Sequence, residues 1–228
     1  MPRRARVIVP EMPHHIVQRG HNRKAVFVEA ADYRYYLANL RRFKLEFGVK
    51  VYSFCLMTNH VHLVVEPGDD VSTVSQLMKQ LAARQTRWVN KAEGRSGSLW
   101  EGRFKISPIQ RDQYLLQCCR YVERNPVAAN MVLRVEQYPW SSYRARAGLI
   151  QLPWLDFEQT YLALGSSKLE REERYRRFVD AEAGVGETEL IRDALARNQL
   201  TGNSAFIDEI ELRMGIRIEH RGRGRPAK

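Results

Sequence analysis

"VKVYSFCLMTNHVHLVVEP", residues 49–67, predicts two β-strands joined by a tight turn. The first strand ends at Met57, Thr58 and Asn59 form the turn, and Pro67 ends the partner strand. A turn this short makes the two strands antiparallel neighbours, so the stretch predicts a β-hairpin.

Two histidines share one face of the second strand. Side chains alternate between the faces of a strand, so His60 and His62 point to one side, roughly 6 to 7 Å apart. Val61, Leu63 and Val65 point to the other side. One face is therefore apolar, and the other carries two imidazoles that could converge on one divalent cation. The alternative is a pair of hydrogen-bonded histidines on a half-exposed sheet face.

The segments around the hairpin alternate between strand and helix patterns. The order is strand, helix, strand, strand, helix, strand, helix, over residues 14–20, 30–47, 49–57, 60–66, 71–94, 97–110 and 111–125. The simplest architecture for this order is an α+β, ferredoxin-like (split β-α-β) antiparallel sheet with helices on one face. RNA-binding modules share this order, so the fold alone does not assign a function.

Glycine-punctuated, highly charged segments follow the predicted sheet. We expect a sheet domain over residues 1–147, a smaller helical region over 148–215 and a disordered basic tail over 216–228. No apolar run approaches the ~20 residues of a membrane span, and no signal peptide follows the N-terminal arginines. Three cysteines without a Cys-x-x-Cys pair argue against disulfides and a cysteine zinc site. We therefore expect a cytoplasmic protein.

The chain is strongly basic. It carries 37 Lys and Arg against 26 Asp and Glu, a formal net charge of +11. This excess favours a polyanionic partner, with nucleic acid as the leading candidate. A basic surface without a specific partner is the alternative.

A predicted helix about sixty residues after the histidine pair carries Tyr121 and Asn125. Residues four apart lie on one helix face, which places a phenol beside an amide that can bind metal. With the histidine pair and the basic chain, this pattern indicates a phosphoryl-transfer site, although a tyrosine on a helix is usually a packing residue. Asn125 precedes Pro126, which disfavours helical geometry at Asn125, so Gln117 is an alternative amide ligand.

These motifs, taken in order, resemble a known family. His60-Val61-His62, "LWEGRFK", Tyr121 and "RNPVAA" resemble the REP-associated tyrosine transposases (RayT). These belong to the IS200-like superfamily, with a His-hydrophobic-His (HUH) motif and a single catalytic tyrosine. "GHNR" at 20–23 and "PWSSY" at 139–143 also resemble family stretches, and the resemblance covers residues 1 to about 147.

The resemblance implies an enzyme that cleaves and rejoins single-stranded DNA beside hairpin-forming repetitive extragenic palindromes, which is DNA transposition. Tyr121 would be the nucleophile and form a 5′-phosphotyrosine intermediate. His60, His62 and Asn125 would hold Mg²⁺ or Mn²⁺ at the scissile phosphate. The family also implies a cytoplasmic, nucleoid-associated monomer, with a dimer as the alternative.

Candidate DNA contacts lie near the predicted strand ends and in the tail. The candidate phosphate contacts are Arg19, Arg23, Arg103 and Lys105. Trp100 could stack on an extruded base, although each of these residues could instead be a surface charge or a core aromatic. Arg223 and Arg225 in "RGRGRPAK" would add salt-sensitive affinity, with minor-groove binding as the alternative.

Two other functions fit parts of the pattern. A non-catalytic, sequence-specific nucleic-acid-binding or regulatory module could use the same fold. A histidine-triad nucleotide hydrolase needs a third histidine at position 64, where this chain has Val64. The first alternative stays open, and the second is a poor fit.

Overall fold

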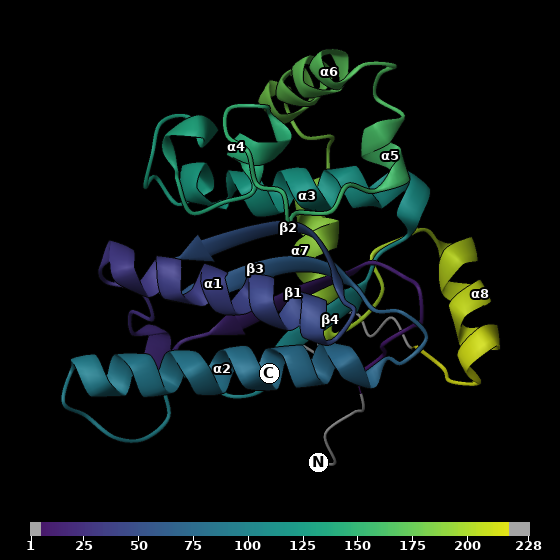
Figure 1. The fold of residues 1–228 in the computed structure, drawn as a ribbon. Coiled ribbons are helices and arrows are strands. Elements are labelled where there is room, and N and C mark those ends of the chain that lie inside the picture. The colour runs from purple at the N-terminus through teal and green to yellow at the C-terminus, as the bar shows by residue number, and fades with distance from the viewer. Residues whose placement is uncertain (1–5, 219–228) are drawn as a thin grey trace, which may run out of the picture.

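The computed structural model describes residues 6–218 (Figure 1). Its first part contains β1 (His14–Arg19), the 3-10 helix η1 (His21–Arg23), α1 (Ala30–Glu46), β2 (Lys50–Met57), β3 (His60–Glu66), α2 (Ser72–Ala92), β4 (Lys105–Pro108) and α3 (Arg111–Ala128). The second part contains η2 (Val135–Gln137), α4 (Tyr143–Arg146), α5 (Gln159–Leu162), α6 (Lys168–Asp180), α7 (Glu187–Arg197) and α8 (Ser204–Met214). Within residues 6–218, no helix is long and apolar enough to cross a membrane.

The four strands form one antiparallel sheet in the order β2-β3-β1-β4. The central strands are β1 and β3, which are far apart in the sequence. His62 of β3 pairs with Val17 of β1 on one side and with Cys55 of β2 on the other. This strand order is that of the split β-α-β fold, so the expected α+β, ferredoxin-like class is confirmed.

The alternation along β3 divides its side chains between two environments. Met57 pairs with His60 across the predicted two-residue turn, which fixes the register of the hairpin. Val61, Leu63 and Val65 are fully buried in the larger core cluster. The apolar stripes of two helices complete this cluster, with Tyr33, Tyr36, Leu40 and Phe43 from α1 and Val74, Leu77, Met78 and Leu81 from α2.

Helices cover the second face of the sheet as well, which corrects the expectation of helices on one face only. Figure 1 shows α1 and α2 on one side of the strands and α3 and α7 on the other. Leu115, Cys118 and Val122 of α3 pack with Tyr52 and Val64 in a second core cluster. The periodicity of a helix reveals its apolar side but not the sheet face that this side covers, so the expectation of one face had no support in the pattern of any single helix.

A buried ion-pair network joins the sheet to the C-terminal helices. The Arg146 guanidinium is fully buried and binds the Glu158 carboxylate through hydrogen bonds of 2.7 and 3.1 Å. It also donates to the Tyr52 carbonyl at 2.9 Å. Glu123 of α3 lies 3.8 Å from the Arg146 Nε and accepts a 2.7 Å hydrogen bond from the Tyr175 hydroxyl of α6. Buried contacts therefore cross the predicted boundary at residue 147.

Arg146→Met should lower the free energy of unfolding by about 3–5 kcal/mol, because Glu158 would remain as a buried carboxylate without its partner. Arg177→Met is the matched control. Arg177 pairs with Glu173 on α6, where the two side chains are 75% and 54% exposed. Such surface pairs contribute at most about 1 kcal/mol. Urea denaturation measures both variants, and equal losses would contradict this account of the network.

Candidate active site

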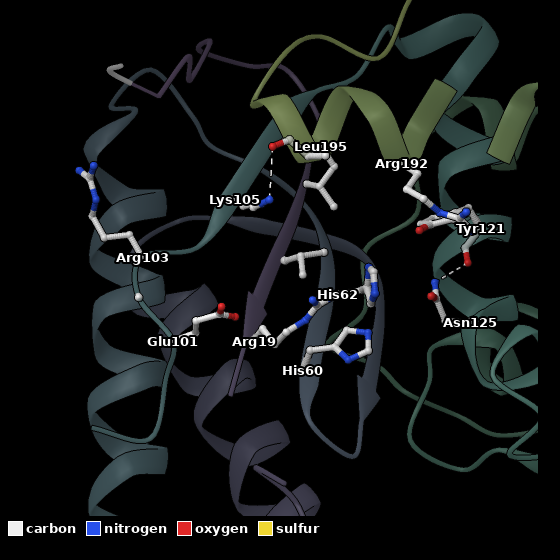
Figure 2. Close-up of a pocket in the computed structure, with 13 residues that line it drawn as sticks. Arg19, His60, His62, Glu101, Arg103, Lys105, Tyr121, Asn125, Arg192 and Leu195 are labelled. Atoms are coloured by element: carbon white, nitrogen blue, oxygen red, sulfur yellow. Dashed lines mark hydrogen bonds between the residues drawn. The ribbon is translucent and has the colours of Figure 1, made fainter. Parts of the chain in front are cut away.

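A pocket of about 530 Å³ lies between the sheet, α3 and α7 (Figure 2). Its polar lining includes His60, His62, Tyr121, Asn125 and Arg192. The fold thus brings the histidine pair and Tyr121 to one cavity, although about sixty residues separate them in the chain. The predicted juxtaposition of strand and helix residues is present in the structure.

The two histidines line the pocket as neutral rings. The ring centroids of His60 and His62 are 4.9 Å apart, and His62 is only 4% exposed. Burial, together with the charge of Arg19, lowers the pKa of His60 to about 4. Burial and neighbouring basic groups also hold the pKa of His62 well below its usual value. Neutral imidazole is the form that binds a metal ion, so both rings are in the ligand state at physiological pH.

The Nδ1 atom of each ring is occupied by another side chain. The Nδ1 of His60 lies 2.6 Å from the Oδ1 of Asn59, its neighbour in the turn. The Nδ1 of His62 lies 2.9 Å from the Nε2 of His15, a fully buried residue of β1. These contacts leave the Nε2 atoms as the nitrogens that could bind a cation.

Tyr121 lies on α3 at the wall of the pocket. Its ring centroid is 6.0 Å from that of His62. Burial raises the pKa of the Tyr121 hydroxyl above its usual value of 10.0, and a hydrogen bond from Arg192 opposes that shift. Figure 2 shows the Arg192 side chain extending from α7 to Tyr121. A guanidinium beside the phenol favours the phenolate and offers hydrogen-bond donors to a nearby phosphate.

Asn125 stays in the helix despite the proline that follows it. Helix α3 continues through Pro126 to Ala128. Pro126 has no N–H to donate to the Val122 carbonyl, and the Asn125 Nδ2 lies 3.3 Å from that oxygen. The same amide donates to the Tyr121 carbonyl at 2.7 Å. The amide nitrogen is thereby engaged, and the carbonyl oxygen is the group that could face a cation. The alternative amide, Gln117, does not line the pocket.

Three of the four predicted phosphate contacts line the same pocket. Arg19, Arg103 and Lys105 do so, and the Lys105 ammonium also lies 3.3 Å from the Ala196 carbonyl of α7. Arg23 is exposed on η1 but does not line the pocket. The predicted contacts in the tail, Arg223 and Arg225, lie outside the described residues.

Trp100 is a core residue, which corrects its assignment as a base-stacking platform. The side chain is 6% exposed and belongs to the cluster beneath α1 and α2. Its indole nitrogen donates to the Ala82 carbonyl of α2 at 3.2 Å. A tryptophan beside basic residues has the same local sequence pattern whether it faces DNA or the core, so the sequence could not distinguish the two.

Two residues of the site carried no signal in the sequence. Arg192 lies in the C-terminal region, where the chain is rich in arginine and nothing singles one out. His15 follows His14 in β1, and only the pairing of β1 with β3 brings it to His62. The pairing of β1 with β3 had to be known to predict this contact, because paired strands place their side chains next to each other on the same face of the sheet.

The side chains of the pocket offer only a few possible ligands for a cation. Among residues 6–218, no group of three or more His, Cys, Asp and Glu side chains is arranged to hold a metal ion. Two imidazole nitrogens and one amide oxygen are the candidate donors near Tyr121, and the Glu101 carboxylate also lines the pocket. Imidazole suits Mn²⁺ better than Mg²⁺, which prefers oxygen. Neutral ligands leave the charge of the ion free to attract an anionic phosphodiester.

A solved structure of another protein shares this fold. A REP-associated tyrosine transposase bound to a REP hairpin matches with a TM-score of 0.55 and 16% identity, over 70% of this chain and 93% of its own. A putative transposase from Deinococcus radiodurans R1 covers 60% of this chain and 98% of its own at 17% identity, with a TM-score of 0.36. The first similarity supports the fold assigned to this chain. The second similarity is too low to support an argument.

The sequence also matches a family model. The model described as "Transposase IS200 like" matches residues 8–125, more than half of the chain. The matched segment contains the histidine pair and Tyr121 and ends at Asn125. A comparison with curated proteins gives no match. The chain belongs to the IS200-like transposase family.

Proposed function

We propose that this protein cleaves and rejoins single-stranded DNA through a covalent bond to Tyr121. The observation that carries the proposal is the single pocket in which Tyr121, His60 and His62 come together. A nucleophile beside two neutral imidazoles and several cationic side chains suits phosphoryl transfer to a phenol. Membership of a transposase family supports the same reaction class.

In the proposed reaction, the Tyr121 oxygen attacks the phosphorus of a phosphodiester. The bond to the 3′ oxygen breaks, the phenolic proton passes to solvent, and the departing oxygen takes up a proton to become a free 3′-hydroxyl. The phosphate stays on Tyr121 as a 5′-phosphotyrosine, which keeps the bond energy for rejoining. The reverse attack by a 3′-hydroxyl releases Tyr121 and joins the strands.

His60 and His62 would hold Mn²⁺ or Mg²⁺ through their Nε2 atoms, with the Asn125 amide oxygen as the third protein ligand. A bound cation would polarise the scissile phosphate and stabilise charge on the leaving oxygen. Arg192 would bind the same phosphate from the opposite wall and hold Tyr121 in position. Arg19, Arg103 and Lys105 would attract the flanking phosphates.

We further propose that the substrate is a hairpin-forming repeat of the REP type. The structure with a TM-score of 0.55 is a REP-associated transposase bound to a REP hairpin, and the net charge of +11 suits such a partner. All groups of the proposed site come from one chain, which supports cleavage by a monomer. A DNA substrate of this kind would place the protein on the nucleoid in the cytoplasm.

Tyr121→Phe should abolish a covalent adduct between the protein and a labelled single-stranded REP-type oligonucleotide in Mn²⁺, because phenylalanine has no nucleophilic oxygen. Tyr114→Phe is the control, since Tyr114 lies on the same helix but does not line the pocket. A denaturing gel detects the adduct. An adduct with Tyr121→Phe would exclude Tyr121 as the nucleophile, and hairpin binding by wild type without any adduct would favour a non-catalytic module.

His60→Ala and His62→Ala should each slow adduct formation roughly 100-fold or more, as expected when a group that stabilises transition-state charge is removed. Chelation with EDTA should stop the wild-type reaction, and added Mn²⁺ should restore it. His21→Ala is the control, because His21 is exposed on η1. Full wild-type activity in EDTA would contradict the metal assignment.

Arg192→Gln should weaken binding of a single-stranded oligonucleotide and reduce its salt dependence. Loss of one phosphate contact should make the slope of log K against log salt shallower by about 0.7. Arg197→Gln is the matched control on the same helix, because Arg197 pairs with Asp193 at 3.2 Å and does not line the pocket. An unchanged slope in Arg192→Gln would remove Arg192 from the phosphate path.

A further inference from the structure

We propose that His15 is the positioning residue for His62, and that it fixes the protonation pattern of that ring by accepting a hydrogen bond from its Nδ1. The inference rests on the proposed function, because it assigns a role to His15 only if the Nε2 of His62 binds a cation. His15 would touch neither the cation nor the DNA, and would act through His62.

The contact between the two rings is close and fully enclosed. His15 Nε2 lies 2.9 Å from His62 Nδ1, and the ring planes are nearly parallel, with centroids 5.2 Å apart and an interplanar angle of 19°. His15 is 0% exposed and His62 is 4% exposed. Water therefore does not compete for this hydrogen bond, and the two rings hold each other in one orientation.

Only one proton can lie between the two nitrogens, and its owner decides what His62 can do. A neutral imidazole carries one N–H, and the other nitrogen has the lone pair that binds a metal. If His62 keeps its proton on Nδ1 and donates to His15, its Nε2 lone pair faces the pocket. If His15 donated instead, the proton of His62 would lie on Nε2 and block the ligand position. Metal binding therefore requires His15 Nε2 to accept.

The partner of His60 shows the same pattern with less ambiguity. The Asn59 Nδ2 donates to the Arg23 carbonyl at 3.0 Å, so its Oδ1 faces His60 Nδ1 at 2.6 Å. An amide oxygen can only accept, so His60 carries its proton on Nδ1 and its Nε2 carries the lone pair. Asn59 and His15 would therefore prepare the two rings in the same way.

The neighbouring histidine shows that β1 can hold a ring in the state that we assign to His15. His14 Nε2 accepts the Val9 N–H at 3.0 Å, so its own proton must lie on Nδ1. His14 and His15 are both fully buried, and the Nδ1 of His15 has no hydrogen-bond partner among the described residues. The two residues differ in what their Nε2 atoms contact, which makes His14 a matched control.

The choice of histidine as the acceptor has an electrostatic consequence. Metal-binding histidines commonly donate to a carboxylate, which adds negative charge near the ion. In this chain the partner is a ring nitrogen of His15 and not a carboxylate. Because this partner brings no carboxylate charge, more of the positive charge of the cation would remain available to the phosphodiester.

Binding of Mn²⁺ alone, measured from the EPR signal of the free ion, tests the proposal without reference to activity. His15→Phe keeps a ring of similar size but cannot accept, so its dissociation constant for Mn²⁺ should rise about 10- to 100-fold. His15→Gln places an amide oxygen near the former Nε2 and should restore much of the affinity. His14→Phe should bind Mn²⁺ as wild type does.

His60→Ala separates failure of the inference from failure of the proposed function. If His60→Ala does not weaken Mn²⁺ binding, the histidine pair is not the metal site and both proposals fall. If His60→Ala weakens binding but His15→Phe does not, only the role of His15 is wrong. A loss in His14→Phe equal to that in His15→Phe would also overturn it, because the effect would then be structural.

A measurement on the wild-type chain avoids dependence on variants that fail to fold. Long-range ¹H–¹⁵N correlations in the presence of Zn²⁺, a diamagnetic ion that also binds imidazole, report which ring nitrogens carry protons. We expect a proton on His62 Nδ1 and none on His15 Nε2. A proton on His15 Nε2 would overturn the proposal.

Discussion

The rest of the structure depends on the alternation of side chains along β3. This strand lies in the interior of the sheet, with β1 on one side and β2 on the other, and helices cover both of its faces. Val61 and Leu63 must face the core beneath α1 and α2, which forces His60 and His62 to the face of α3. A shift by one residue would bury the histidines in that core and remove them from the pocket. The energy of packing the core and the geometry of the site are therefore set by the same register.

The second requirement is that α3 stays aligned with that face. Its residues pack on β2 and β3, and buried charged groups join it to the C-terminal helices. Arg120 of α3 pairs with Glu187 of α7 at 2.6 Å, with both side chains less than a tenth exposed. Ile191 of α7 is fully buried in the same cluster as α3, which brings Arg192 to Tyr121. The C-terminal helices thus form one wall of the pocket and supply one of its cations.

Much of the fold could be predicted because it is encoded in local periodicity. The turn at Thr58 and Asn59 and the order of strands and helices follow from neighbouring residues, and the ferredoxin-like class follows from that order. The sequence also predicted that His60 and His62 share one face of their strand. The position of Tyr121 could be predicted from the resemblance to the family. The contributions of His15 and Arg192 could not, because they arise from strand pairing and helix docking between distant segments.

Two local rules also gave incomplete answers. A residue before proline is disfavoured in a helix, yet Asn125 remains helical, and its side-chain amide lies 3.3 Å from the Val122 carbonyl to which Pro126 cannot donate. An aromatic residue among basic ones suggested a DNA contact, yet Trp100 contributes to the core instead. In both cases the sequence did not reveal the hydrogen bond present in the folded chain, to the Val122 carbonyl or to the Ala82 carbonyl.

The central claim is that Tyr121 forms the covalent bond to DNA, and peptide mapping tests it most directly. Trypsin cleaves after arginine, so residues 121–124, "YVER", should be released as a peptide whose only tyrosine is Tyr121. After reaction with a single-stranded REP-type oligonucleotide in Mn²⁺ and nuclease digestion, mass spectrometry should find a 5′-linked nucleotide on this peptide. A nucleotide on any other peptide, such as residues 112–120 with Tyr114, would contradict the account.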